Sequence, residues 1–403
     1  MNHLTKTALF LFLNQVFLWG FAQLLGLSPN ALGVFPDLPP EPSKATYFVA
    51  LDGNDNWDGQ SVETPFQTIV KAIQVAKPGD VVFIREGAYH EAKALRFETS
   101  GSKDKPITFM SYPGEQATIE WSGHEGGSEK ESVVIDGADY LIFRNLIIRD
   151  SPQQCLLLLN SADHNYFINM QFLDCWGSGF QIFEGSQNIV AYSRALGNYG
   201  GGNSDGFGSI GQGGESDANE FWYNIAGNNS DDGFDTWKGT HTLLFGNIAF
   251  ENGYNGGDGN GFKLGSDGVL NQGIIQRNIA FENTRDGFDT NLGGGNLIEN
   301  NTAFANGRHN FEHSRAVKEN VFRNNLSAQG SVAMFANPIE ENNNWNLNLT
   351  NPGFLSTNHH DPLFLSLSQD SLLIDRGRLG SLQFTGAAPD LGALEYGRKL
   401  QIQ

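Results

Sequence analysis

The sequence Ser-Asp-Asp-Gly-Phe-Asp at residues 230–235 is the fullest copy of a short pattern that recurs in this 403-residue chain. Its Asp-Gly-Phe core, or an Asn-Gly-Phe equivalent, occurs four times, with the aromatic residue at Phe207, Phe234, Phe262 and Phe288. The steps between these phenylalanines are 27, 28 and 26 residues. A period between about 20 and 50 residues indicates a solenoid, a propeller or another repeat array.

A second repeat, in which asparagine precedes a short apolar run, passes through the same region. Its copies align at Asn145, Asn169, Asn224, Asn247, Asn278, Asn301 and Asn325, and one copy near Ser193 has lost its asparagine. Leucine signatures and helical periodicity are lacking, and each copy holds short β-prone runs separated by Gly, Asn, Asp and Ser. The repeats therefore predict an all-β, right-handed parallel β-helix. A propeller is the alternative, although its blades need about 40 residues.

In such a coil, equivalent residues of successive turns stack about 4.8 Å apart. The four phenylalanines are therefore expected to form an interior ladder, continued by Phe311 and, backwards, by Phe180 and Leu156. The repeated asparagines are expected at bends, where they tolerate left-handed geometry and hydrogen-bond along the stack. We interpret both ladders as structural.

A single domain is expected over 46–398. Ile69, Ala72, Ile73 and Ala76 fall on one face of a predicted helix. It would cap the N-terminal end of the solenoid at about 65–79, since exposed solenoid ends need covering. The coil is expected over about 80–345, and a C-terminal segment, about 346–398, is expected to pack against it.

The N-terminus resembles a targeting segment. Lys6 precedes an apolar run from Ala8 to Leu27, and Gly20-Phe21-Ala22 is a small-x-small site. We predict a signal peptide over 1–27, a proline-containing linker over 28–45, and a secreted protein, extracellular or periplasmic. An uncleaved anchor is the alternative, because the run is about long enough to span a bilayer.

Two cysteines, Cys155 and Cys175, could form a disulfide in an exported protein. They lie 10 and 6 residues after the nearest repeat asparagines. This mismatch places them on different parts of the turn and argues against a bridge.

The composition is acidic, with 45 acidic and 25 basic residues and a net charge of −20. Unassisted binding to nucleic acid or to an acidic membrane surface is therefore not expected, nor is a stable membrane partner, and we expect a monomer. The 49 glycines and only 4 methionines suit a turn-rich β structure better than a helical one.

Aligning the turns on the phenylalanines brings four carboxylates together. Asp205 and Asp232 lie two residues before the aromatic position on adjacent turns, Asp231 lies beside them, and Asp235 lies one residue after it. Because they flank an inward residue, these side chains should point outward. Stacked carboxylates repel one another unless a cation neutralises them, and Ca²⁺ accepts several carboxylate oxygens. We predict a calcium site here. The alternative is a solvated acidic turn.

Lys263 is expected one rung from Asp235 and is the candidate catalytic base. A nearby cation would lower the pKa of this lysine, whereas Asp235 and Asp289 would raise it, so the sequence leaves the net sign open. Candidate substrate-binding residues near the same face are Lys238, Arg285, Asp289, Arg308 and His309.

These motifs resemble polysaccharide lyase family 9, which comprises secreted pectate lyases on a parallel β-helix. The resemblance rests on Ser-Asp-Gly-Phe at 204–207, Ser-Asp-Asp-Gly-Phe-Asp-Thr-Trp at 230–237, and Gly-Asn-Gly-Phe-Lys-Leu-Gly at 259–265. It implies that the family's calcium-binding aspartates correspond to Asp205, Asp231, Asp232 and Asp235, and its catalytic lysine to Lys263.

The reaction that the resemblance implies is β-elimination on an acidic polysaccharide such as polygalacturonate. Three alternatives stay open from the sequence. A β-helical glycoside hydrolase would use two of the carboxylates, an alginate lyase or epimerase would act on a different uronate polymer, and a non-catalytic carbohydrate-binding solenoid would use calcium only to link its turns.

Overall fold

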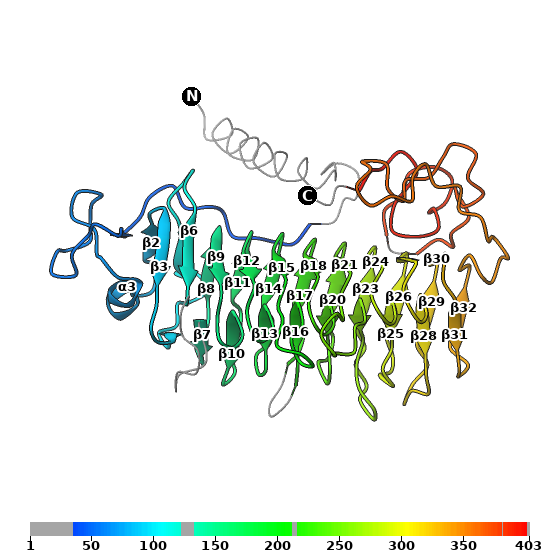
Figure 1. Ribbon diagram of the computed structural model, residues 1–403, viewed down its shortest axis with the longest axis horizontal. Helices are drawn as coiled ribbons and strands as arrows, with labels where there is room; N and C mark the ends of the chain where they lie inside the picture. Colours follow the sequence, from blue (N-terminus) through cyan, green and yellow to red (C-terminus); the bar gives the residue numbers. More distant parts are fainter. Residues whose placement is uncertain (1–34, 122–132, 212–215, 381, 401–403) are drawn as a thin grey trace.

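The computed structural model describes residues 35–121, 133–211, 216–380 and 382–400. Its strands form three long parallel sheets that run side by side along the molecule, and each turn of the chain visits the three sheets in order (Figure 1). This is the right-handed parallel β-helix that the repeats predicted, and the propeller alternative is wrong.

The first sheet has 12 strands. They are β1 (Tyr47–Val49), β2 (Val81–Ile84), β5 (Ile107–Ser111), β8 (Leu141–Arg144), β11 (Tyr166–Ile168), β14 (Ile189–Ala191), β17 (Glu220–Trp222), β20 (Leu243–Phe245), β23 (Ile274–Gln276), β26 (Leu297–Glu299), β29 (Val321–Arg323) and β32 (Ile339–Glu341).

The second sheet has 10 strands. They are β3 (Gly87–His90), β6 (Ala117–Glu120), β9 (Leu146–Arg149), β12 (Gln171–Leu173), β15 (Arg194–Leu196), β18 (Ile225–Gly227), β21 (Ile248–Phe250), β24 (Ile279–Phe281), β27 (Thr302–Phe304) and β30 (Leu326–Ala328).

The third sheet, which carries the aromatic repeat, also has 10 strands. They are β4 (Leu95–Phe97), β7 (Val133–Asp136), β10 (Leu156–Leu159), β13 (Phe180–Ile182), β16 (Phe207–Ser209), β19 (Phe234–Asp235), β22 (Phe262–Lys263), β25 (Phe288–Asp289), β28 (Phe311–His313) and β31 (Val332–Met334).

The phenylalanine ladder is confirmed. Phe207, Phe234, Phe262, Phe288 and Phe311 are paired in register, fully buried and stacked, with ring centroids 4.7–5.1 Å apart. The same register continues backwards through Phe180 and Leu156, as expected. Burying a large apolar side chain contributes about 1.5–3 kcal/mol, so this ladder is a main source of stability for the coil.

The asparagine ladder exists, but its predicted alignment was partly wrong. From Asn224 to Asn325 each Nδ2 donates to the Oδ1 of the next asparagine at 3.0–3.1 Å. In register, Asn224 aligns with Ser193, whose N–H donates to the Asn224 Oδ1. Asn145 and Asn169 lie one residue earlier on the turn. They adopt positive φ, whereas from Asn224 onward the ladder asparagines do not. The left-handed bend there belongs to the preceding residue, such as Tyr223.

The ends of the coil are covered by different elements. At the N-terminal end lies the helix α3 (Ile69–Val75), which buries Ile69 and Ala72. The Thr68 side chain caps it by accepting a hydrogen bond from the Lys71 N–H at 3.1 Å. At the other end, residues 342–380 and 382–400 form an irregular segment beside the last turns (Figure 1). It is anchored by a buried ion pair between Arg277 and Glu395 at 3.0 Å.

The residues before the first strand are not a free linker where they are described. The carbonyl of Pro39 accepts a hydrogen bond from the Arg144 guanidinium. The Phe35 ring packs against the Tyr223 ring, with the two ring centroids 6.4 Å apart. The segment therefore lies along the coil (Figure 1). The predicted signal peptide lies outside the described residues. Within those residues, no helix has the length and apolar character to span a bilayer.

The expectation for the cysteines was wrong, because Cys155 and Cys175 form a disulfide with their Cα atoms 5.7 Å apart. Cys155 is the last residue of the corner over 150–155, between the second and third sheets, and Cys175 is the second residue of the equivalent corner, 174–179, on the next turn. They do occupy different parts of the turn. However, Leu156 pairs with Phe180, so Cys155 aligns with Gly179 on the next turn, and the corner is short enough for Cys175 to reach it.

Candidate functional site

The corner between the second and third sheets holds the predicted site, and a ladder that the sequence reading missed supports it. Asn198, Asn229, Asn252, Asn283 and Asn306 are buried and joined by side-chain hydrogen bonds of 2.7–2.9 Å. The signal was an asparagine recurring at steps of 31 and 23 residues. This ladder fixes the corner just before each acidic loop.

The glycine that follows the aspartate in the repeat is structural. A Cβ atom on Gly233 would lie 2.6 Å from the carbonyl oxygen of Gly261 on the next turn. The close approach of the turns therefore requires glycine. It does not require the acidic residue before it, so Asp232 needs a separate explanation.

Asp205, Asp231 and Asp232 converge, with one carboxylate oxygen from each lying within 4.8 Å of the others. All three are buried. Asp205 Oδ1 accepts from the Asp232 N–H at 3.2 Å, as expected for stacked turns. Asp232 Oδ1 accepts from the backbone and side-chain nitrogens of Asn260 at 2.7 and 2.9 Å. Its other oxygen, Oδ2, is buried and accepts no hydrogen bond.

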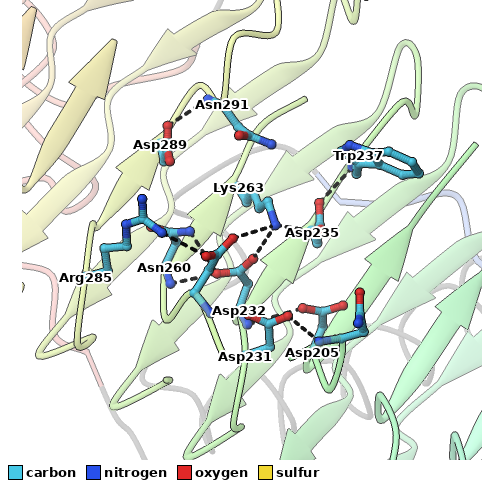
Figure 2. Close-up of polar contacts among 12 residues, drawn as sticks. Asp205, Asp231, Asp232, Asp235, Trp237, Asn260, Lys263, Arg285, Asp289 and Asn291 are labelled. Carbon is cyan, nitrogen blue, oxygen red and sulfur yellow. Dashed lines mark hydrogen bonds and ion pairs between the residues drawn. The ribbon is translucent and has the colours of Figure 1, made fainter. Parts of the chain in front are cut away.

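Lys263 reaches the same place from the next turn (Figure 2). Its Nζ lies 3.2 Å from Asp232 Oδ2, 3.5 Å from Asp235 Oδ2 and 3.0 Å from Asp258 Oδ2. The register of Asp235 beside Lys263 is as predicted. Asp235 is held by the Trp237 N–H, which donates to its Oδ1 at 2.8 Å. We call Asp205, Asp231, Asp232, Asp235 and Lys263 the Lys263 cluster.

Burial dominates the electrostatics of this cluster. It raises the pKa of Asp205 and Asp232 well above the ordinary range, and it raises the pKa of Asp235 to about 6, while Lys263 opposes the shifts. Burial by itself would lower the pKa of Lys263. The charges of Asp235, Asp232, Asp205 and Asp258 outweigh it, so the lysine pKa is raised.

The sequence left the direction of the Lys263 pKa shift open, and in the protein without a bound cation the shift is upward. The carboxylates that raise the lysine pKa are those of Asp235, Asp232, Asp205 and Asp258, and Asp289 is not among the main contributors. Asp258 was missed because it lies in a loop outside the repeat.

A cleft of about 460 Å³ opens beside the cluster over the third sheet. Its lining residues are Gln154, Gln181, Phe183, Asn203, Ile210, Asp235, Trp237 and Lys263. Lys263 and Asp235 thus face a space large enough for a ligand, in line with their predicted outward orientation.

The predicted substrate-binding residues lie in varied settings, and none of them lines this cleft. Lys238 places its Nζ 4.2 Å from the centre of the Trp237 ring. Arg285 Nη1 pairs with Asp258 Oδ1 at 2.8 Å. His309 Nδ1 is 2.7 Å from Ser331 Oγ.

Arg308 and Asp289 belong to a second acidic cluster one turn further on. Asp286, Asp289 and Glu312 bring carboxylate oxygens within 4.8 Å of one another. Arg308 Nε lies 2.9 Å from Asp286 Oδ1, and its Nη2 contacts Asp286 Oδ2. Burial, followed by the hydrogen bond and charge of Asp289, raises the pKa of Glu312 to about 9. We call these four residues the Arg308 cluster.

The donor set of the Lys263 cluster fits a hard divalent cation. Three buried carboxylates converge, and the buried Asp232 Oδ2 accepts no hydrogen bond and has only the Lys263 ammonium 3.2 Å away as an ion-pair partner. All the donors are oxygens, which suit Ca²⁺ better than a transition metal. Asp235 is not within the same 4.8 Å group, so it stands further from the centre.

The chain is similar in sequence and in structure to pectate lyases with a right-handed β-helix. Residues 47–325 match the family described as "Pel9A-like, right handed beta helix region". Pectate lyase L of Dickeya chrysanthemi is 30% identical over 394 residues, which cover 88% of this chain and 91% of that protein. Pectate lyase PEL9 of Emericella nidulans is 28% identical over 366 residues, covering 78% and 87%. The crystal structure of pectate lyase Pel9A superposes with a TM-score of 0.80 at 28% identity, covering 87% of this chain and 96% of that one.

Proposed function

Since the chain belongs to polysaccharide lyase family 9, we propose that it is a calcium-dependent pectate lyase that cleaves polygalacturonate by β-elimination. The observation that carries this proposal is the position of Lys263. Its Nζ faces the cleft and contacts Asp232, Asp235 and Asp258 beside three convergent carboxylates. The names of the related proteins support pectate as the substrate.

Asp205, Asp231 and Asp232 would hold the calcium ion, with Asp235 at its edge. When bound, calcium would neutralise these carboxylates and withdraw electron density from the substrate carboxylate, which makes the proton on C5 more acidic. The remaining steps depend on residues of the chain itself.

Lys263 is the proposed base. Its amine takes the C5 proton, the electron pair of that C–H bond forms the C4–C5 double bond, and the C4–O bond breaks. The leaving oxygen takes a proton, which gives a new chain end and a 4,5-unsaturated end. Burial favours the neutral amine, and the carboxylates oppose it. The base form therefore becomes accessible when the carboxylate charges are compensated.

The structure gives the hydrolase alternative little support. A glycosidase needs two carboxylates about 5–9.5 Å apart, across the bond that is cleaved. Here one oxygen from each of Asp205, Asp231 and Asp232 lies within 4.8 Å of the others, which suits a shared cation, and Asp235 pairs with a lysine that a hydrolase would not use.

The test is an ultraviolet absorbance assay for the unsaturated product on polygalacturonate, rhamnogalacturonan and alginate, with calcium and then with a chelator. We expect absorbance to rise on polygalacturonate and to stop after chelation. New reducing ends without absorbance would identify a hydrolase, and activity restricted to alginate would move the chain to a different substrate.

We also propose that the protein is exported with residues 1–27 as its signal peptide, and that it acts as a monomer on the acidic polymer. The apolar run behind Lys6 supports export. The negative net charge of −20 argues against nucleic acid as a partner. N-terminal sequencing of the secreted protein would test the cleavage.

A further inference from the structure

Three exposed aromatic side chains gather at the corner between the second and third sheets. Trp176, Tyr199 and Tyr254 are exposed at 49%, 41% and 52%. Trp176 and Tyr199 come from neighbouring turns and pack edge to face, with ring centroids 5.6 Å apart. We call these three residues the aromatic platform.

Tyr254 comes from a loop two turns further along the coil. Its hydroxyl lies 3.5 Å from the carbonyl of Asn198, and the neighbouring Asn255 Nδ2 donates to the carbonyl of Tyr199 at 2.8 Å. Single exposed aromatics are common on soluble proteins. Here a loop folds back across two turns to add a third ring to an exposed pair, and grouped apolar surface of this kind is characteristic of binding sites.

The platform and the Lys263 cluster are built on the same loops. Asp231 Oδ2 accepts from the Asn203 N–H in the loop after Tyr199, and Asp231 Oδ1 accepts from the Asp258 N–H in the loop of Tyr254, both at 2.5 Å. Ser204 Oγ donates to the carbonyl of Trp176 at 2.9 Å. Asn203 also lines the cleft. The platform is therefore fixed relative to the cleft, on the side of the earlier turns.

The charge beside the platform is negative. The pKa of Tyr254 is raised, first by burial, then by the negative charge of Asp174 and then by Tyr199. The Asp174 carboxylate therefore lies close to the platform. Arg149 is shared between two carboxylates, with its Nε 2.6 Å from Asp150 Oδ2 and its Nη2 3.4 Å from Asp174 Oδ2, so these three groups keep a net negative charge. A sugar carboxylate is disfavoured here, whereas the apolar C–H face of a pyranose ring matches the aromatic surfaces.

We propose that the aromatic platform binds pyranose rings that carry no free carboxylate, such as methyl-esterified galacturonate. These rings belong to the part of the polymer that extends from the cleft toward the earlier turns. The inference rests on the proposed function and sharpens it. The Lys263 cluster acts on a free uronate, and the platform accepts esterified units further along the same chain.

The test compares a partially methyl-esterified pectin with fully de-esterified polygalacturonate as substrates. Trp176→Ala and Tyr254→Ala are each expected to raise KM for the esterified pectin about 3- to 10-fold, which is the scale of one aromatic contact. The rise should be smaller on polygalacturonate, and kcat should change little on either.

Trp57→Ala is the matched control. Trp57 is exposed at 42% and lies between β1 and α3, at the N-terminal end of the coil. Its replacement should leave KM unchanged on both polymers. An equal KM for Trp176→Ala and the unmodified chain on esterified pectin would overturn the platform.

A binding measurement separates this inference from the proposed function. Electrophoresis through a gel containing the esterified pectin, with chelator present, reports binding without turnover. Weaker retardation of Trp176→Ala supports the platform even if no lyase activity is found, whereas equal retardation counts against it. Absence of turnover on both polymers by the unmodified chain would overturn the proposed function.

Discussion

Two clusters of buried carboxylates lie on neighbouring turns of the third sheet, and they differ in how the chain neutralises them. In the Arg308 cluster, the guanidinium binds both oxygens of Asp286, and Glu312 keeps its proton up to a pKa of about 9. In the Lys263 cluster, one ammonium serves several carboxylates, and Asp232 Oδ2 accepts no hydrogen bond. We infer that the chain itself neutralises the first cluster, whereas the second needs a further cation.

This difference shows that acidic residues at the same repeat position have different roles. A buried charge needs a partner, and breaking such a pair is costly. Where the chain provides that partner itself, the cluster is expected to hold the turns together. Where the chain provides too little positive charge for its buried carboxylates, the cluster is expected to bind a cation and to lose stability without one.

The largest effect is expected from Lys263→Ala. Removing a general base typically lowers turnover by about 10²–10⁴-fold, so kcat on polygalacturonate should fall by that amount while calcium binding persists. The ultraviolet absorbance assay measures the loss. Lys71→Ala on α3 is the control and should keep full activity. Retention of activity by Lys263→Ala would remove this residue from the mechanism.

The double variant Asp231→Asn, Asp232→Asn should abolish calcium binding in isothermal titration calorimetry. It should also remove calcium-dependent stabilisation, which amounts to about 2.7 kcal/mol at a hundredfold excess over Kd. The matched variant Asp286→Asn, Asp289→Asn changes the Arg308 cluster. It should bind calcium with the affinity of the unmodified protein. If both variants lost calcium equally, the proposed distinction between the clusters would be wrong.

Arg308→Ala is expected to destabilise the protein without preventing calcium binding. It leaves the fully buried Asp286 carboxylate without its ion-pair partner, and only hydrogen bonds such as that from the His309 N–H remain. Because Arg308 itself is 39% exposed, water screens part of the pair, and we expect a loss of about 1–2 kcal/mol in urea denaturation. Arg308→Lys should recover part of this loss. Unchanged stability together with a raised KM would instead favour the substrate-binding role predicted from the sequence.

Glu312→Gln should produce the smallest effect, and it should depend on pH. The pKa of Glu312 is raised to about 9 in the folded chain from an ordinary 4.5. Between these values the unfolded chain loses this proton while the folded chain keeps it, so the stability contribution falls as pH rises. The variant should therefore gain stability relative to the unmodified protein as the pH rises from 5 to 8. Parallel pH profiles in chemical denaturation would contradict the assignment.

The sequence predicted the repeating parts of the molecule well, because a solenoid turns sequence spacing into spatial neighbourhood. The phenylalanine ladder followed directly from steps of 27, 28 and 26 residues. The asparagine register failed between Asn169 and Asn224, since Asn145 and Asn169 occupy the left-handed bend itself, whereas Asn224 follows the bend at Tyr223. The disulfide was missed because counting along the chain does not measure the distance across a tight corner.

By itself, the sequence determined the fold, the stacking of Asp205 on Asp232 and the place of Lys263 beside Asp235, because all of these depend on a period. Only the tertiary structure decided what lies outside the period. Asp258 enters the site from an irregular loop, Arg308 completes a second cluster, and Tyr254 folds back across two turns. Loops bring such residues together through contacts that no spacing encodes, and these contacts decide which of two similar acidic clusters has capacity for a cation.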